Sequence, residues 1–525
     1  MKPRSITLEL PDGSSPTIEV PSGRDDSSLA DLLEAKGYRL NTRCGGRGLC
    51  RGCQVTCQSK GHSESFRSCQ TQLHALPAGP LRLVIPRTSW HDQTLHGVSF
   101  FEIHLPDSIP RRQSKALALA LDIGTTTLAG ALWDLSTGQC LAHTALANPQ
   151  RPYGDNVLSR ISYSVEHPDG CAKLQKALVD QGLKPLIETL ARQAKIPAAS
   201  IETATVAGNP VMLHTLLACR LEGLSTYPFR PVFLDARTLP AAEIGLEAGF
   251  TLELLPSLGP FVGADIVAGA LAAGMLNEAG PSLLIDFGTN GEILLHHAGR
   301  FHATATAAGP AFEGGRLSCG ASASGRVISS LSHCPSSWTY RLCDGSGGDP
   351  SGISGSAYID FLAQALDSGL VNTFGRFDRN HPDVSTHLVD GETEHIVRFS
   401  PEIWISEPDV AEILQAKAAI GAGVQVLLEL AGLDAADLKT IFVAGGFGYH
   451  LDPRHAMRVG LLPEVTQERI EIIGNAALGG ASLALQADFS AAIQALRSQC
   501  QVVELNQIPS FSDHYMDALT LEPLE

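Results

Sequence analysis

The chain has 525 residues, enough for about three or four domains, and its 44% hydrophobic and 18% charged content is ordinary for a globular protein. Its 38 basic and 55 acidic residues give a net charge of −17, which argues against nucleic acid or an anionic membrane as a partner. We expect neither a secretory leader nor a membrane span, because no signal-peptide pattern follows Met1 and no apolar run is long enough. The cysteines outside the N-terminal region show no pairing rhythm, so we expect a cytoplasmic protein.

The first 87 residues are predicted to fold as a small sheet with one helix. Alternating apolar residues predict strands over 5–10 and 16–20, joined by a turn at Asp12 and Gly13. Residues 28–36 begin with a serine and continue with an amphipathic pattern, which predicts a capped helix. Residues 54–57 and 81–85 supply further strands.

Four cysteines in this region, three of them within one glycine-rich loop, predict a thiolate cage. They are Cys44, Cys50, Cys53 and Cys69. Zinc ribbons usually present two short Cys-x2-Cys pairs, so a shared loop with a later fourth cysteine favours a 2Fe–2S cluster, with a zinc site and a disulfide pair as the alternatives. The glycines let the loop curl and direct backbone N–H groups at the sulfurs. Cys57, in a predicted strand, is interpreted as a bystander.

Two copies of one strand–turn–strand pattern follow residues 88–115, a stretch without periodicity that we interpret as a linker. The residues concerned are Asp122, Gly124, Thr125 and Thr126 in the first copy and Asp286, Gly288, Thr289, Asn290 and Gly291 in the second. Glycine lets backbone N–H groups approach a phosphate, threonine adds a hydroxyl donor, and aspartate stands where Mg²⁺ or its waters would lie. One copy alone would usually be only a turn, but the pair is predicted to clamp a polyphosphate.

A third glycine motif and two charged residues complete the candidate site. Gly445 and Gly446 follow an apolar strand and would let a nucleoside lie against bare backbone. Asp265 stands at a predicted helix N-terminus, where it either orients a water for attack on a γ-phosphate or only caps its helix. Lys417 lies on a predicted helix, and a lone lysine there is usually a solvated charge.

These motifs together resemble the superfamily of acetate and sugar kinases, Hsp70 and actin (ASKHA), with phosphate motifs at 122–127 and 286–291 and an adenosine motif at 444–448. The resemblance implies an α/β actin-like ATPase domain, a duplicated ribonuclease-H-like fold, whose subdomains at 116–262 and 263–525 close over ATP. It also implies that Asp122 and Asp286 hold Mg²⁺ and that these two residues and Asp265, as the catalytic base, carry the chemistry. Residues 1–87 resemble an α+β β-grasp ferredoxin of the 2Fe–2S type.

The fusion of such a ferredoxin to such an ATPase resembles the reductive activators of corrinoid proteins. Several further segments carry this resemblance by their order along the chain: 148–150, 153–161, 208–212, 307–315, 415–420 and 474–481. By analogy with this family, Lys417 would reach the nucleotide. The resemblance covers the chain from about residue 4 to residue 525.

The implied function is that of an ATP-hydrolysing iron–sulfur oxidoreductase. It would pass one electron from a 2Fe–2S cluster to the inactive Co(II) corrinoid of a methyltransferase-system corrinoid protein and restore Co(I). The implied cofactors are the cluster, ATP and Mg²⁺, and the implied partners are the corrinoid protein, an upstream electron donor and a second copy in a homodimer. The alternatives are an ASKHA small-molecule kinase with a redox-sensing ferredoxin domain and a plain ferredoxin electron carrier.

Overall fold

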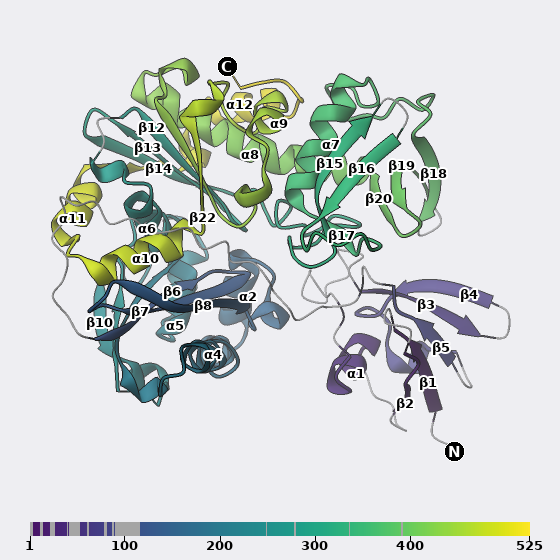
Figure 1. The fold of residues 1–525 in the computed structure, drawn as a ribbon, viewed down its shortest axis with the longest axis horizontal. Helices are drawn as coiled ribbons and strands as arrows, with labels where there is room; N and C mark the ends of the chain where they lie inside the picture. Colours follow the sequence, from purple (N-terminus) through teal and green to yellow (C-terminus); the bar gives the residue numbers. More distant parts are fainter. Residues whose placement is uncertain are drawn as a thin grey trace. The chain divides into compact units, whose positions relative to one another are not determined.

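The computed structural model describes residues 4–10, 14–20, 27–38, 40, 53–59, 62–77, 81–86, 89, 116–247, 249–277, 280–334, 337–389 and 392–524 (Figure 1). The chain divides into two compact units, one of residues 1–94 and 313–413 and the other of residues 95–312 and 414–525. The predicted turn at Asp12 and Gly13 lies outside the described residues, as does the predicted linker apart from Ser89.

A mixed five-stranded sheet in the order β2-β1-β5-β3-β4 occupies the N-terminal region. Its strands are β1 (Arg4–Glu9), β2 (Thr17–Val20), β3 (Gln54–Ser59), β4 (His62–Arg67) and β5 (Leu81–Val84). Strand β5 runs parallel to β1, and the other neighbours are antiparallel. The helix α1 (Leu29–Ala35) begins at a capping box in which Ser28 and Asp31 bond to each other's backbone N–H, as the sequence pattern predicted.

Two three-stranded sheets and one helix form residues 327–406. The elements are β15 (Val327–Cys334), β16 (Ser337–Leu342), β17 (Gly352–Ile353), α7 (Gly355–Asp367), β18 (Val384–Val389), β19 (Glu392–Ser400) and β20 (Ile403–Ser406). Their sheet orders are β16-β15-β17 and β18-β19-β20. The helix α7 packs against β15.

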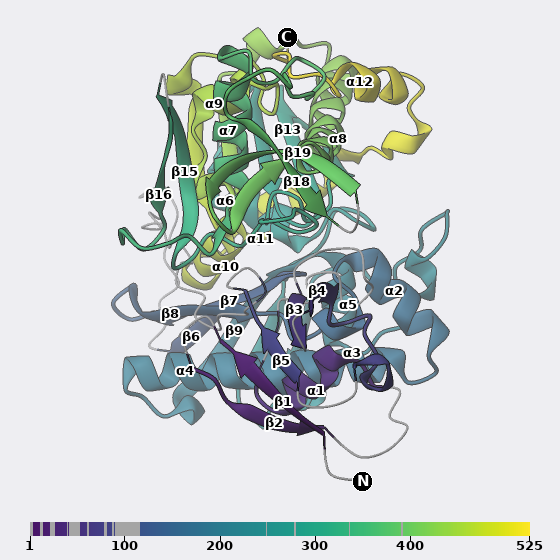
Figure 2. The same ribbon diagram turned by 90° about the vertical axis from the view of Figure 1, so that its right-hand side faces the viewer.

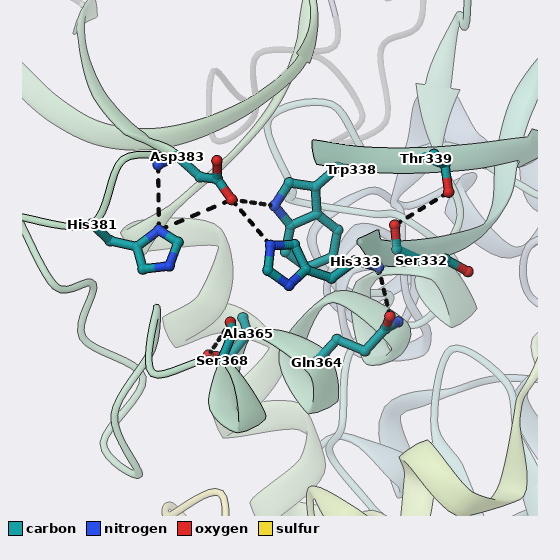
Figure 3. A network of polar contacts seen from close by, with 9 residues as sticks. All are labelled: Ser332, His333, Trp338, Thr339, Gln364, Ala365, Ser368, His381 and Asp383. Atoms are coloured by element: carbon teal, nitrogen blue, oxygen red, sulfur yellow. Dashed lines mark hydrogen bonds and ion pairs between the residues drawn. The ribbon is translucent and has the colours of Figure 1, made fainter. Parts of the chain in front are cut away.

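A polar network joins these two sheets (Figure 3). One carboxylate oxygen of Asp383 accepts hydrogen bonds from Nε2 of His333 and Nε1 of Trp338, each at 3.2 Å. The backbone N–H of Asp383 donates to Nδ1 of His381 at 3.3 Å. The Trp338 ring also packs against Phe361 of α7, with ring centroids 5.1 Å apart. The network therefore fixes the loop before β18 to the β15–β16 hairpin.

The second unit contains two six-stranded sheets, in the orders β10-β11-β9-β6-β7-β8 and β22-β21-β12-β13-β14-β23, which share the topology of five strands and differ in the edge to which the sixth, β10 or β23, adds. The first has β6 (Leu117–Ile123), β7 (Thr127–Asp134), β8 (Gln139–Ala147), β9 (Ile201–Gly208), β10 (Arg237–Pro240) and β11 (Thr251–Leu254). The second has β12 (Ser282–Phe287), β13 (Gly291–His297), β14 (Arg300–Thr306), β21 (Thr440–Ala444), β22 (Ile470–Gly474) and β23 (Cys500–Val502).

Both sheets begin with an antiparallel meander, to whose first strand a later strand adds in parallel. The meanders are β6-β7-β8 and β12-β13-β14, and the added strands are β9 and β21. A further parallel strand, β11 or β22, extends each sheet. The repeated topology is what the predicted duplication requires.

Helices cover these sheets on both faces. They are α2 (Val157–Glu166), α3 (Gly170–Lys176), a π-helical segment (Ala177–Leu183), α4 (Lys184–Ala194), α5 (Pro210–Leu216), α6 (Ala264–Ala272), α8 (Glu407–Ala431), α9 (Pro453–Arg458), α10 (Ala476–Gln486), α11 (Ser490–Gln499) and α12 (Phe511–Asp517). Among the described helices, α8 alone is long and apolar enough to span a bilayer, but 78% of its apolar window is buried in the protein. This burial is that of a core helix.

The helices α6 and α10 cross between the two sheets of the second unit (Figures 1 and 2). Gly480 on α10 lies against the α6 backbone so closely that a Cβ there would overlap the carbonyl oxygen of Ala268. On the α10 side, Trp133 of β7 donates from Nε1 to the Ser482 hydroxyl at 3.1 Å. The crossing therefore requires a residue without a side chain at position 480, and it joins the two halves into one core.

We expect Gly480→Ala to lower the free energy of unfolding by about 1–3 kcal/mol, because overlap with a backbone carbonyl outweighs the gain of about 1 kcal/mol in helix propensity. Urea unfolding followed by tryptophan fluorescence would measure the change. Gly249→Ala is the matched control, because Gly249 is exposed and has nothing within 4 Å of an added Cβ. An unfolding midpoint of the Gly480 variant equal to that of the wild type would contradict the tight crossing.

Candidate functional site

The two predicted phosphate hairpins lie in contact. Asp122 is the penultimate residue of β6 and Asp286 that of β12, and each strand is followed by a polar turn and an antiparallel strand. The hydroxyls of Thr126 and Thr289, one from each turn, lie 2.7 Å apart. Equivalent turns from the two repeats are thus held together by a hydrogen bond, which confirms that the hairpins meet at one site.

Four carboxylates gather at this site. Burial raises the pKa of Asp122 to about 7, and the nearby Asp265 charge adds to this shift. Burial likewise raises the pKa of Asp265 to about 6. Burial, followed by the charges of Asp265 and Asp286, raises the pKa of Glu292 well above its usual value. Glu292 is only 6% exposed, whereas the three aspartates keep partial solvent access.

Asp265 does not cap its helix. The N-cap residue of α6 is Gly263, and Asp265 is the second residue of the helix. Its Oδ1 accepts the backbone N–H of Ile266 at 2.9 Å. The carboxylate charge thus lies at the positive end of α6 and near those of Asp122 and Glu292, which favours the reading of Asp265 as a site residue.

Two asparagines hold the first hairpin from neighbouring helices. Asn475 caps α10 through its Oδ1 and donates from Nδ2 to Oδ2 of Asp122 at 2.9 Å. Asn209 caps α5 and donates from Nδ2 to the Thr125 hydroxyl at 2.9 Å. No sequence motif predicted a role for either asparagine or for Glu292. A signal existed for Glu292, because it is a lone charge beside the apolar residues of β13.

The adenosine motif lies directly beside the second hairpin. Strand β21 pairs in parallel with β12, so Ala444 lies opposite Asp286. Gly445 has a φ of +92°, and a Cβ there would stand 3.0 Å from Oδ1 of Asp286. Gly446 has nothing within 4 Å of an added Cβ. Gly445 is thus packed against the backbone of β12, where a Cβ would meet the Phe287 carbonyl oxygen at 2.5 Å, and open space lies beside Gly446. The contact of these glycines with a nucleotide stays a prediction.

Lys417 is fully buried on α8 and has a partner within the protein. Its ammonium donates to the Gly460 carbonyl at 3.4 Å. Burial lowers the pKa of Lys417 to about 8, while the charge of Glu522 opposes this shift. The contact of Lys417 with a nucleotide stays a prediction.

Two of the four predicted cluster cysteines lie at the same end of the β3–β4 hairpin, and Cys44 and Cys50 lie outside the described residues. Cys53 is buried directly before β3, and Cys69 follows β4. Both the N–H and the hydroxyl of Ser68 donate to the Cys53 carbonyl, at 3.1 and 2.9 Å. The side-chain amide of Gln70 lies 3.8 Å from Sγ of Cys69, as a donor to a thiolate would.

Cys57 is 4% exposed within the core of the N-terminal sheet. Burial, and then the charge of Glu64, raises the pKa of its thiol. A raised thiol pKa disfavours the thiolate that a metal would need. This environment agrees with its interpretation as a bystander.

The donor set at the two hairpins suits a divalent cation. Across the described part of the chain, no three or more His, Cys, Asp or Glu side chains are arranged to hold a metal by themselves. Mg²⁺ in nucleotide sites is instead held by one or two carboxylates together with phosphate oxygens and waters. Such a cation would offset the cost of ionising these carboxylates, whose pKa values are raised.

Family models and a solved structure are similar to this chain over most of its length. Residues 280–524 match the family model described as the C-terminal domain of RACo, the ASKHA domain, and residues 117–278 match the RACo middle region. The solved structure of a "reductive activator for corrinoid, iron-sulfur protein" superposes with a TM-score of 0.73 at 26% identity and covers 99% of both chains.

Two curated proteins are also similar. The "corrinoid activation enzyme RamQ" of Eubacterium limosum is 28% identical over 571 aligned positions, covering 94% of this chain and 95% of that protein. A "[Co(II) methylated amine-specific corrinoid protein] reductase" of Methanosarcina barkeri is 27% identical over 394 positions, covering 69% and 68% respectively.

The pKa of Asp122 predicts how the stability of the metal-free protein depends on pH. An unfolded aspartate has a pKa near 3.9 and folded Asp122 one of about 7, so between these values the unfolded chain gives up a proton that the folded protein keeps. The stabilisation from this group is complete below about pH 4 and is lost as the pH rises through 7.

We therefore expect Asp122→Asn to be more stable than the wild type at pH 8, by on the order of 2 kcal/mol, and this advantage to shrink at pH 5. Thermal unfolding in EDTA at both pH values would measure it. An advantage of the same size at both pH values would show that Asp122 does not carry the raised pKa.

Proposed function

Because the chain belongs to the family of reductive activators of corrinoid proteins, we propose that it uses ATP to pass one electron to the inactive Co(II) corrinoid of a partner protein and restores Co(I). The observation that supports the ATP part is the contact between Thr126 and Thr289, which brings the two predicted phosphate hairpins together. The partner would belong to a methyltransferase system, and an upstream donor in the cytoplasm would supply the electron.

Each carboxylate has a proposed role in this scheme. Asp122 and Asp286 lie one residue before the ends of the two strands that lead into the hairpin turns, and they would hold Mg²⁺ through its waters or directly. Asp265, with a pKa of about 6, is ionised at neutral pH and would orient the water that attacks the γ-phosphate. Glu292 lies deeper, where burial and then the charges of Asp265 and Asp286 raise its pKa, so a bound cation would also offset the cost of its charge.

The N-terminal sheet supports an iron–sulfur role. Its strand order and mixed directions, with α1 as the described helix, support the proposal of a β-grasp ferredoxin fold. Cys53 and Cys69 would supply two ligands at one end of the β3–β4 hairpin, and Cys44 and Cys50 would supply the others. A bound 2Fe–2S cluster supplies one-electron chemistry near about −400 mV in ferredoxins of the plant type.

ATP is proposed to make this transfer favourable. For one electron, each shortfall of about 59 mV in potential lowers the equilibrium constant about tenfold. ATP binding and hydrolysis can offset a shortfall only if the nucleotide states differ in affinity for the partner or for its cobalt state. The two-repeat site suits this task because its hairpins come from both halves of the core, so a bound polyphosphate would contact both.

We expect a Co(II) corrinoid partner to stimulate ATP hydrolysis by the full-length protein. Asp286→Ala should abolish hydrolysis and corrinoid reduction while it leaves the cluster's visible absorption unchanged, because Asp286 is on a different unit from the cysteines. Phosphate release and the visible spectrum would be measured side by side. If the Asp286 variant still activated the corrinoid protein, the chain would be a plain electron carrier. If the wild type transferred the phosphoryl group to a metabolite instead of to water, the chain would be a kinase.

Cys53→Ser provides the converse variant. It should lose the cluster absorption and corrinoid reduction but keep its affinity for ATP, because the sheet that carries Cys53 and the hairpins are separate units. Cys57→Ser is the matched control, since Cys57 is a core residue, and its spectrum should match that of the wild type. A spectrum lost in the Cys57 variant and retained in the Cys53 variant would overturn the ligand assignment.

A further inference from the structure

A buried arginine stands behind the first phosphate hairpin. Arg160 lies on α2 and is 0% exposed. Its guanidinium donates from Nη2 to the Thr125 carbonyl at 2.6 Å, from Nη1 to Oε1 of Gln150 at 3.0 Å and from Nε to the Gly154 carbonyl at 3.0 Å. Nη1 also contacts Sδ of Met212 at 3.2 Å. All four acceptors are neutral groups.

Among the described residues, no carboxylate is a hydrogen-bond partner of this buried positive charge. Burial, and then the charge of Arg151, lowers the pKa of Arg160 to about 9, while Asp155 opposes this, so the guanidinium is still charged at neutral pH. A buried charge without a bonded counter-ion costs several kcal/mol. A bound anion nearby would offset that cost.

Arg160 also fixes the direction of the turn. Asn148 donates from Nδ2 to the Gly124 carbonyl at 2.8 Å, and Arg160 holds the next carbonyl, that of Thr125. In a trans peptide the N–H points opposite to the C=O. The N–H groups of Thr125 and Thr126 therefore point away from Asn148 and Arg160.

The four carboxylates of the site would repel a polyphosphate, and a fixed positive charge one peptide behind the turn offsets this repulsion. We propose that Arg160 is a positioning residue that lets the first hairpin accept a polyphosphate, so that the site selects nucleoside triphosphates over monophosphates. This inference rests on the proposed ATP-dependent function and adds to it the origin of the phosphate preference. Arg160 acts through the Thr125 carbonyl and through its charge, without touching the nucleotide.

The test compares the affinities of the full-length protein for ATP, ADP and AMP with Mg²⁺ present, by isothermal titration calorimetry. In Arg160→Gln we expect the affinity for ATP to fall about 10- to 100-fold, that for ADP to fall less and that for AMP to change little. Arg160→Lys keeps the charge but not the fork of donors, so its losses should be smaller and follow the same order. Arg192→Gln removes an exposed charge of the same unit and should bind all three nucleotides as the wild type does.

The other outcomes would overturn the inference or the proposed function. Equal losses for the three nucleotides, in whichever Arg160 variant folds, would show a purely structural role and overturn the inference, and so would unchanged affinities. If the Gln variant does not fold, the Lys variant alone decides by the order of its losses. A wild-type protein that binds none of the nucleotides would instead contradict the proposed ATP-dependent function itself, and the inference with it.

Discussion

The electrostatic repulsion among Asp122, Asp265, Asp286 and Glu292 is the constraint on which the second unit depends. Carboxylates that share a poorly solvated site raise one another's pKa, and other groups of the folded protein must offset their repulsion. The chain does so with an amide from Asn475 and with the N-terminus of α6. Mg²⁺ would complete the compensation. Under the proposed function, the cation and its polyphosphate would offset a repulsion that otherwise lowers the stability of the folded protein.

The crossing of α6 and α10 is what brings these groups together. Asp265 is in the first turn of α6, and Asn475, whose amide supports Asp122, caps α10. The packing of Gly480 against Ala268 therefore sets the distance between Asp265 and Asn475. Because α6 contacts strands of both sheets and α10 contacts strands of the first, a change in the angle between the repeats would shift these helices. Under the proposed function, such a shift would link the nucleotide state to the rest of the chain.

Local patterns explain what the sequence could predict. An apolar strand that ends in Asp-x-Gly is legible without a structure, and the two hairpins, the start of α6 and the capped helix α1 lie where these patterns placed them. The ASKHA architecture, too, was predictable from the order of such patterns.

The supporting residues could not be predicted in this way. Asn475 lies 353 positions from Asp122, and Arg160 lies 35 positions from Thr125, so neither pairing has a local signature. The two short sheets of residues 327–406 were not anticipated, because their strands alternate weakly and follow no chemical motif. The cluster ligands Cys44 and Cys50 still rest on sequence alone, while Cys53 and Cys69 lie at one end of a hairpin.

The central claim is that ATP drives electron delivery to a corrinoid. The most direct measurement mixes the reduced full-length protein with a Co(II) corrinoid protein anaerobically, with and without Mg-ATP, and follows the Co(I) absorption band. We expect the band to grow with Mg-ATP and to be absent or much weaker without it. A band of equal size and rate without ATP, or no band with any corrinoid protein of the same cell, would contradict it.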